Sequence, residues 1–232
     1  MSSKYKSPTF RLASGAYALV TATLLAHGQT ASAAVLALYD FDGTTLLAPT
    51  STHPGVSASN IVAASGAPSE RSTAPASTEN LGLNYQANTG GIVTSETAAF
   101  DGDRYFFFTL TLTDPVDFTT LMFKFGAGGG TLERSTFVRT SLDNFANNLG
   151  SSMSTEAVYS DVTYDMAAVY GALAEGVTGE VEFRFYHYNN STTNNRTIVF
   201  DDITVSGAII PEPSSPLIAV LGLGCLLVRR RR

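Results

Sequence analysis

The chain has 232 residues, of which 44% are hydrophobic and only 15% are charged, with 20 glycines and 9 prolines. This length suits a single domain, and the low charge disfavours a coiled-coil protein, which would be rich in Glu, Lys and Arg. The single Cys excludes an internal disulfide framework and a zinc-finger cluster. The part from Ala34 to Ile210 carries 7 basic against 19 acidic residues. A segment this acidic does not follow a phosphate backbone, so we expect no nucleic-acid partner.

Residues 1–33 have the pattern of a secretory signal peptide. Three basic residues at the start lead into a mostly apolar stretch, Leu12–Ala26, which is too short and too interrupted for a good membrane span. The small residues Ala31 and Ala33 then form the pattern that signal peptidase reads. We therefore expect cleavage after Ala33, so that the mature chain begins at Ala34. The alternative is an uncleaved N-terminal anchor.

The C-terminal segment 209–232 combines three elements in a fixed order. They are the motif Pro211, Glu212 and Pro213, an apolar stretch Leu217–Val228, and the basic residues Arg229, Arg230, Arg231 and Arg232. A helix over the apolar stretch would be about 18 Å long, which is short of the hydrocarbon thickness of about 30 Å. The four arginines resist translocation and are expected to stay in the cytoplasm while the preceding domain is exported. A short transmembrane helix with a basic end favours transient retention in the membrane.

This order of Pro-Glu-Pro, apolar helix and terminal arginines resembles the PEP-CTERM sorting signal of Gram-negative bacteria, also called the ice-binding protein C-terminal domain. The resemblance is confined to residues 211–232. It implies processing by an exosortase-like membrane protease in a species that makes extracellular polysaccharide. We therefore expect signal peptidase and exosortase as partners, transient attachment to the inner membrane, and a final location in the cell envelope or outside the cell. The resemblance concerns sorting and implies no ice binding.

Between the two ends, apolar and polar residues alternate with a period of two, which predicts β-strands. The expected strands are Val35–Phe41, Leu81–Tyr85, Arg104–Leu112, Thr119–Phe125, Thr131–Thr140, Glu180–Tyr188 and Thr197–Ser206. Asp114–Pro115 and Asn189–Ser191 are predicted as turns and Ser65–Ser77 as an exposed loop. A helical turn is expected only within Thr155–Leu173. The pattern indicates an all-β domain at 34–208, an antiparallel two-sheet β-sandwich of the jelly-roll type.

Two pairs of aspartates lie at opposite ends of this domain. Asp40 and Asp42 end the first strand, and Asp201 and Asp202 lie in the last. The first and last strands of a jelly roll often lie close together, and clustered carboxylates supply the oxygen ligands that Ca²⁺ prefers. Alternation places Asp201 on the same strand face as Ile203, so a buried carboxylate there would need a partner. The alternative to a calcium site is that hydrogen bonds within the protein satisfy these aspartates.

The strand Glu180–Tyr188 has two different faces. One is expected in the core and carries Val181, Phe183, Phe185 and His187. The other combines charges with tyrosines and carries Glu182, Arg184, Tyr186 and Tyr188. Tyrosine rings stack on the apolar face of a sugar while charged groups bind its hydroxyls, so Arg184, Tyr186 and Tyr188 form a candidate polysaccharide-binding surface. The alternative is ordinary cross-strand packing, which the absence of Trp favours.

No nucleophile, metalloprotease or phosphate-loop motif is present in the sequence. The opening Tyr39–Gly43 and the ending Asp201–Val205 resemble those of carbohydrate-binding-module and galactose-binding-like jelly rolls. That resemblance implies a non-catalytic module, often with a structural calcium. We therefore expect an exported, non-catalytic protein of the envelope or extracellular matrix, with a structural, adhesive or polysaccharide-associated role. The alternative is a carbohydrate-active enzyme, a glycoside hydrolase or lyase whose carboxylates no motif reveals.

Overall fold

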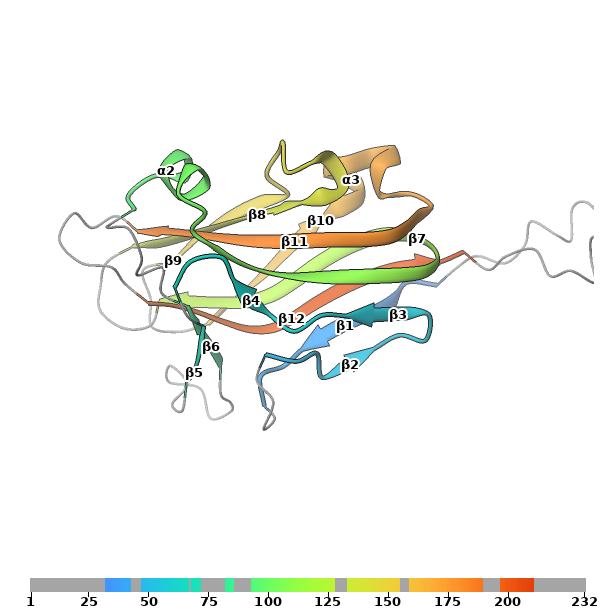
Figure 1. The fold of residues 1–232 in the computed structure, drawn as a ribbon, viewed down its shortest axis with the longest axis horizontal. Coiled ribbons are helices and arrows are strands. Elements are labelled where there is room, and N and C mark those ends of the chain that lie inside the picture. The colour runs from blue at the N-terminus through green and yellow to red at the C-terminus, as the bar shows by residue number, and fades with distance from the viewer. Residues whose placement is uncertain are drawn as a thin grey trace, which may run out of the picture. The chain divides into compact units, whose positions relative to one another are not determined.

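The computed structural model describes residues 32–42, 47–66, 68–71, 82–85, 93–127, 133–154, 159–189 and 197–210. Within these ranges the chain is mostly antiparallel β-structure with a few short helices (Figure 1). The elements are β1 (Ala34–Tyr39), β2 (Ser51–Thr52), β3 (Val56–Ala58), β4 (Val62–Ala63), β5 (Ser69–Arg71), β6 (Gly82–Tyr85), α2 (Glu96–Asp101), β7 (Tyr105–Ala127), β8 (Arg134–Thr140), the 3₁₀ helix η1 (Ser141–Asp143), β9 (Gly150–Ser154), β10 (Ser160–Asp165), α3 (Met166–Tyr170), the 3₁₀ helix η2 (Gly171–Ala174), β11 (Val177–Asn189) and β12 (Ile198–Ile209).

The longest strand, β7, belongs to both layers of the fold. Its first half pairs with β11 and its second half with β12. Between the halves β7 bends back on itself, as Figure 1 shows, and the pairing places the bend between Leu112, which lies opposite Gly179, and Val116, which lies opposite Ile209. Pro115 has no N–H to contribute to a ladder, but its carbonyl oxygen accepts a hydrogen bond from the Ile210 N–H at 2.8 Å. The two strands predicted for this region are therefore halves of one bent strand, and the predicted turn is a bend that does not end it.

The strands form two layers that share β7. One layer contains β3 and β4, the first half of β7, then β11, β8 and β9. The other contains β10, the second half of β7, then β12, β1 and β2, with β6 also paired to β12 and β5 paired to β6. Because β7 passes from one layer to the other, the hydrogen bonding is that of one 12-stranded sheet folded over itself. The predicted antiparallel β-sandwich is confirmed in its layers, although the two layers are not separate sheets.

Aromatic rings from both layers fill the core. On the first layer Phe106 stacks on Phe185 with ring centroids 4.9 Å apart, and Phe108 stacks on Phe183 at 5.1 Å. From the second layer the ring of Phe200 meets Phe185 edge-on at 5.7 Å. All five side chains are completely buried. Each such pair contributes about 0.5–1.5 kcal/mol beyond the burial of its area, so these ring contacts add to the stability that burial alone provides.

The first and last strands are adjacent, as predicted, because β1 pairs with β12 and Tyr39 lies opposite Ile203. A β-bulge interrupts β12 next to this contact. Asp201 lies opposite Lys124 of β7 and Thr204 lies opposite Met122, so three steps along β12 match only two steps along β7. Asp202, within this stretch of β12, has a positive φ of 49°. The extra residue shifts the alternation, so the prediction that Asp201 and Ile203 share a strand face was wrong. Ile203 points into the core and Asp201 lies on the side of Lys124.

Several short elements differ from the sequence-based prediction. The segment predicted as the loop Ser65–Ser77 contains β5, which pairs with β6. The expected helical turn within Thr155–Leu173 is confirmed by α3, but β10 directly before it was missed. Helix α2 and strands β2, β3, β4 and β9 were also not predicted. Each of these elements has six residues or fewer, which is too short for a periodic pattern to develop.

The two predicted targeting segments lie mostly outside the described residues. Ala31 and the whole of Pro211–Arg232 are not described, and Ala33 directly precedes the first strand at Ala34. Among the residues that the structure does describe, no helix is both long and apolar enough to cross a membrane. The predicted helix Leu217–Val228 is not among them, so signal cleavage and the sorting tail remain predictions.

Candidate functional site

The outward face of the β8–β11–β7 layer carries a row of three aromatic rings. Pairing places Tyr186 of β11 opposite Phe137 of β8 on one side and Tyr105 of β7 on the other. The rings of Phe137 and Tyr186 are parallel within 5° with centroids 4.6 Å apart, and the Tyr105 ring lies 4.9 Å from that of Tyr186. Residues far apart in the sequence therefore meet because antiparallel neighbours project to the same face.

The next row on the same face contains two arginines. Arg184 of β11 lies opposite Arg139 of β8 and Phe107 of β7. The guanidinium carbon of Arg184 lies 3.6 Å from the ring centroid of Phe145 and 4.8 Å from that of Tyr105. A cation over a ring is attracted by its electron-rich face, an effect of about 0.5–2 kcal/mol depending on exposure. Arg184 thus lies between two aromatic rings on a partly exposed surface.

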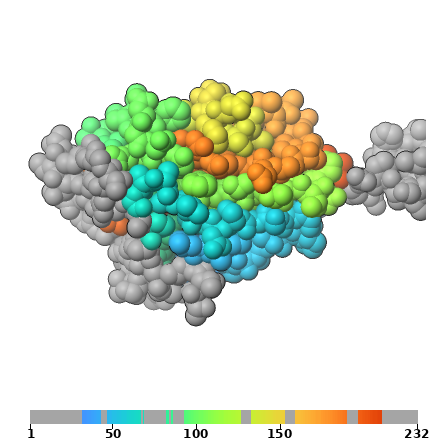
Figure 2. Space-filling model, viewed as in Figure 1, coloured from blue at the N-terminus to red at the C-terminus, as the bar shows by residue number. Residues whose placement is uncertain are grey.

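Helix α2 covers part of this face, and Figure 2 shows it beside the segment that follows β8. The helix begins at Ser95, whose side-chain oxygen accepts a hydrogen bond from the Ala98 N–H at 3.2 Å. The ring of Phe100 lies 5.6 Å from that of Tyr186, and the two belong to a small hydrophobic cluster separate from the main core. The helix therefore shields the middle of the aromatic row from solvent.

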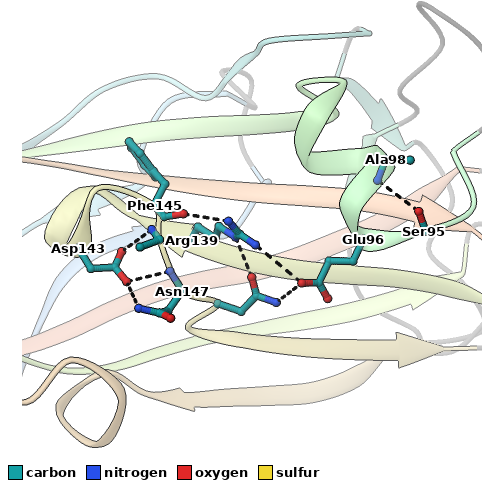
Figure 3. Close-up of polar contacts among 9 residues, drawn as sticks. Ser95, Glu96, Ala98, Arg139, Asp143, Phe145 and Asn147 are labelled. Carbon is teal, nitrogen blue, oxygen red and sulfur yellow. Dashed lines mark hydrogen bonds and ion pairs between the residues drawn. The ribbon is translucent and has the colours of Figure 1, made fainter.

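Arg139 connects the sheet to both covering segments, as Figure 3 shows. Its Nε donates to Asn148 Oδ1 at 2.8 Å and its Nη1 to the Phe145 carbonyl oxygen at 2.9 Å. Its Nη2 lies 3.8 Å from Glu96 Oε1, and Asn148 Nδ2 donates to that same oxygen at 2.7 Å. The guanidinium carbon also lies 4.1 Å from the centroid of the Phe100 ring. With these donors engaged, Arg139 acts as a brace and is not a free ligand-binding group.

The loop after β8 holds Phe145 in a costly backbone conformation. Asn144 and Phe145 have φ values of 57° and 60°, a region that bulky side chains rarely adopt. Asp143 stabilises the loop, since its carboxylate accepts from the Ala146 N–H at 3.2 Å and from the Asn147 N–H at 2.9 Å (Figure 3). The Phe145 N–H also donates to the Thr140 carbonyl oxygen at 2.9 Å. Together these bonds fix the ring of Phe145 over Arg184.

The three binding residues predicted from the sequence have different environments. Arg184 is about one quarter exposed and its Nε donates to Glu182 Oε1 at 2.5 Å. Tyr188 is half-buried, with its ring 6.2 Å from that of Phe137. Tyr186 is only 1% exposed, and burial raises the pKa of its hydroxyl. The sequence predicted that Tyr186 is exposed to a ligand, and this is wrong. Its buried ring instead packs against Tyr105 and Phe137.

Three half-buried side chains on this face and the nearly buried Tyr105 beside them make up what we call the arginine–aromatic surface: Tyr105, Phe107, Phe145 and Arg184. Phe107 and Phe145 are half-buried, and Tyr105 is 9% exposed with its ring 5.9 Å from that of Phe107. Sequence analysis missed the three aromatic members. Tyr105 and Phe107 were predicted to lie in a strand, and the alternation of that strand was the one available signal for their shared face.

The structure gives each predicted aspartate hydrogen-bonding or ionic partners within the chain. Asp40 Oδ1 accepts from Thr50 Oγ1 at 2.5 Å and from the Asp42 N–H at 3.1 Å. Asp202 Oδ2 lies 2.6 Å from Lys124 Nζ, and the hydrogen bond to Asp202 raises the pKa of that lysine. Asp201 Oδ1 accepts from the Asp202 N–H at 2.9 Å. These contacts within the protein therefore stabilise the aspartates without a bound cation.

Asp201 is the most perturbed carboxyl group described. It is 1% exposed, and burial, with the neighbouring charge of Asp202, raises its pKa to about 7. The charge of Asp42 acts in the same direction, so Asp42 lies close enough to Asp201 to influence it. Among the described residues, however, no group of three or more His, Cys, Asp or Glu side chains is arranged to hold a metal ion. The calcium site therefore remains a prediction.

Comparisons with known proteins give weak matches only. No protein-family model and no curated protein matches the chain. A family 11 carbohydrate-binding module from Clostridium thermocellum, in complex with a β-1,3-1,4-mixed-linked tetrasaccharide, has 10% identity and a TM-score of 0.36 over 77% of this chain and 100% of its own. The CBM22-1 xylan-binding domain of Paenibacillus barcinonensis Xyn10C has 10% identity and a TM-score of 0.38 over 79% of this chain and 100% of its own.

A third similar structure is part of an enzyme. The α-L-arabinofuranosidase MgGH51, bound to arabinose, has 10% identity and a TM-score of 0.43, and the match covers 79% of this chain but 30% of that one. Scores this low do not transfer a ligand or an activity. The function is therefore argued below from the residues of this chain.

Proposed function

We propose that this chain is an exported, non-catalytic protein of the envelope or extracellular matrix whose β-sandwich binds polysaccharide through the arginine–aromatic surface. The observation that carries the proposal is the position of Arg184 between the rings of Tyr105 and Phe145, with Phe107 beside them. Rings with a fixed orientation next to a hydrogen-bond donor are the combination that sugar recognition requires.

The chemistry of this surface suits a sugar ring. An aromatic ring packs on the apolar C–H face of a sugar, while a guanidinium donates hydrogen bonds to hydroxyl or carboxylate oxygens. Glu182 fixes Arg184 through its 2.5 Å contact and also supplies an acceptor for sugar hydroxyls. Tyr188, half-buried on the same strand face, extends the surface toward the end of β11. The order imposed by α2 and the 141–149 loop lowers the entropy cost of binding.

A glycan array probed with the full chain in mild detergent tests the proposal. We expect binding to at least one polysaccharide class, and Phe107→Ala and Phe145→Ala should each weaken it by about 1–3 kcal/mol, on the scale of base–aromatic stacking. Met122→Ser is the matched control, since Met122 is 40% exposed on the other layer. Absence of binding by the wild-type chain to any glycan would refute the proposed function.

The sorting part of the proposal rests on the sequence. We propose cleavage after Ala33 by signal peptidase and recognition of Pro211–Pro213 by an exosortase-like protease, with transient attachment to the inner membrane. Mass spectrometry of envelope and medium fractions should find a chain that begins at Ala34 and lacks Arg229–Arg232. Recovery of only full-length, membrane-bound chain would contradict transient anchoring. Replacing the four arginines with Ser should weaken retention, because the positive-inside constraint is removed.

A carbohydrate-active enzyme remains the second candidate, favoured by the raised pKa of Asp201. Glycoside hydrolysis needs two carboxyl groups on either side of the scissile bond, one of them with a raised pKa. Asp201 has that pKa but is 1% exposed, so a polysaccharide does not reach its carboxyl group in this conformation. Release of reducing ends or unsaturated sugars from envelope polysaccharide, lost in Asp201→Asn, would support the enzyme instead of the binding protein.

A further inference from the structure

Exposed large hydrophobic side chains gather at one end of the sandwich. The described residues include six of them: Val35, Val62, Met122, Val169, Leu173 and Ile210, with exposed fractions of 47, 49, 40, 44, 54 and 37%. Single exposed hydrophobic residues are common and need no explanation, but a group of them in one region does. Four of the six lie at the end where β7 bends, and we call these four the apolar rim: Val35, Val169, Leu173 and Ile210.

Strand pairing shows that the members of the rim share this end. Val177, the first residue of β11, lies opposite Val116, and Val116 in turn lies opposite Ile209. Two strand spacings of about 4.8 Å therefore separate the start of β11 from the end of β12. Helices α3 and η2, which carry Val169 and Leu173, directly precede β11 and pack against β7. Figure 1 shows α3, the bend of β7 and the end of β12 at the same end.

Strand β1 brings Val35 to the same region, since Val35 lies opposite Ser206, three residues before Ile209. The helical part of the rim also exposes Ala167, Ala168 and Ala172, so this segment presents almost no polar side chain to solvent.

Two of the carboxylates near the rim accept hydrogen bonds from backbone N–H groups. Asp165 caps α3 by accepting from the Ala168 N–H at 2.9 Å, and Asp117 accepts from the Gly176 N–H at 2.7 Å. Asp114 and Glu175 remain at this end as well. The rim is therefore apolar with a few acidic neighbours. This favours contact with zwitterionic lipids, which carry no net charge, over contact with anionic lipids.

The chain itself indicates what the rim faces. The described structure ends at Ile210, and the apolar stretch Leu217–Val228 begins after only six more residues. Six extended residues span about 20 Å at most. If the apolar stretch enters a bilayer, Ile210, the rim residue next to the tail, is held within that distance of the lipid surface. The rim is the apolar part of the domain at the end from which the chain leaves.

We propose that the apolar rim contacts the surface of the lipid bilayer while the tail is in the membrane, and so orients the arginine–aromatic surface relative to it. The inference rests on the proposed membrane insertion of the tail. Apolar groups at an interface lie about 5–10 Å into the boundary between headgroups and acyl chains. Val169 and Leu173 lie on a short helical segment and are exposed, so they are the rim residues expected to insert.

The absence of Trp from the chain makes a direct test possible. The full chain with Leu173→Trp, and separately with Val169→Trp, is reconstituted into phosphatidylcholine vesicles, with brominated lipids as quenchers. We expect a blue shift and a loss of Trp emission, stronger when the bromines lie near the headgroups than when they lie deep in the acyl chains. Replacing part of the lipid with phosphatidylglycerol should reduce the quenching, because Asp114 and Glu175 are repelled.

Val62→Trp is the matched control. Val62 is 49% exposed and lies opposite Phe107, which in turn lies opposite Arg184 of β11. Arg184 is seven residues along β11 from Val177, which lies at the rim end of the strand. That spacing corresponds to about 23 Å, so its emission should not be quenched.

Three results would overturn the proposal and are distinguishable. If the wild-type chain does not float with vesicles, both tail insertion and rim contact are wrong. If it floats but neither Leu173→Trp nor Val169→Trp is quenched, rim contact alone is wrong. If both reporters are blue-shifted without vesicles and light scattering gives a dimer, the rim binds a second copy of the chain instead of lipid.

Discussion

The two faces of β11 show how one strand serves two different purposes. Its inward face stacks Phe183 and Phe185 on their neighbours in β7 at ring distances of 5.1 and 4.9 Å, closed off by the second layer. Its outward face makes an equally close stack of Tyr186 on Phe137 at 4.6 Å. There, however, arginines alternate with the rings, and the cover is one short helix and one loop. Loss of packing on the inward face is therefore expected to destabilise the whole domain. Loss of packing on the outward face is expected to affect only the helix and loop that cover it.

The largest difference between the faces should appear on truncating Phe185. Phe185→Ala removes a completely buried ring that touches rings from both layers, and we expect a loss of about 3–5 kcal/mol in the free energy of unfolding. Tyr188→Ala, on the half-buried outward face, should cost much less. Urea denaturation followed by circular dichroism measures both. Equal losses for the two variants would mean that the outward face is as much a core as the inward one.

A pH titration examines Asp201, the one strongly perturbed carboxyl group among the residues that the structure describes. Its pKa of about 7 in the folded state exceeds its ordinary value of 3.8, so the folded chain binds more protons than the unfolded chain between these values. The free energy of unfolding should therefore fall as the pH rises from about 4 to 7 and then level off. Asp201→Asn should remove most of this slope.

Calcium changes that expectation in a defined way. A cation bound among Asp40, Asp42, Asp201 and Asp202 would favour the charged form of Asp201, so calcium would reduce the slope and raise the melting temperature relative to chelator. Identical curves with calcium and with EDTA would leave the aspartates satisfied by the protein alone.

The brace at Arg139 should have a smaller and local effect. Arg139→Ala removes bonds to Asn148 and Phe145 and the contact with Glu96, and charged hydrogen bonds contribute about 1.5–3 kcal/mol each when buried, less at a partly exposed site. We expect faster amide exchange in α2 and the 141–149 loop, with exchange in β7 and β12 unchanged. Arg139→Lys should not restore slow exchange, because an ammonium cannot reproduce the planar fork. Uniformly faster exchange would contradict a local role.

The smallest effect is expected at the start of α2. Ser95→Ala removes the cap on the Ala98 N–H and should cost about 0.5–2 kcal/mol of local stability. Ser95→Asp preserves an acceptor and serves as the control. Amide exchange of α2 measures both variants, and unchanged exchange in Ser95→Ala would show that packing of Phe100 alone holds the helix.

Sequence analysis predicted the strand-forming segments of the core well because alternation in β7, β11 and β12 extends over many residues. It could not predict the bulge at Asp202, since one extra residue leaves no compositional signal, and that residue reversed the expected side of Asp201 relative to Ile203. For the candidate site, alternation correctly placed Arg184 and Tyr186 on one face. The burial of Tyr186 depends on Phe100 and Phe137, which only the strand register and a six-residue helix bring to it. The Ser-Glu pair at Ser95–Glu96 was the one local signal for that helix.

The most direct test of the central claim is to locate the bound polysaccharide by NMR. With the full chain in detergent micelles and an array-positive oligosaccharide, the account predicts chemical-shift changes at the Arg184 Nε–H and at the rings of Phe107 and Phe145, with little change at Phe183 and Phe185. Shift changes confined to the apolar rim, or spread evenly over the domain, would contradict polysaccharide binding by the arginine–aromatic surface.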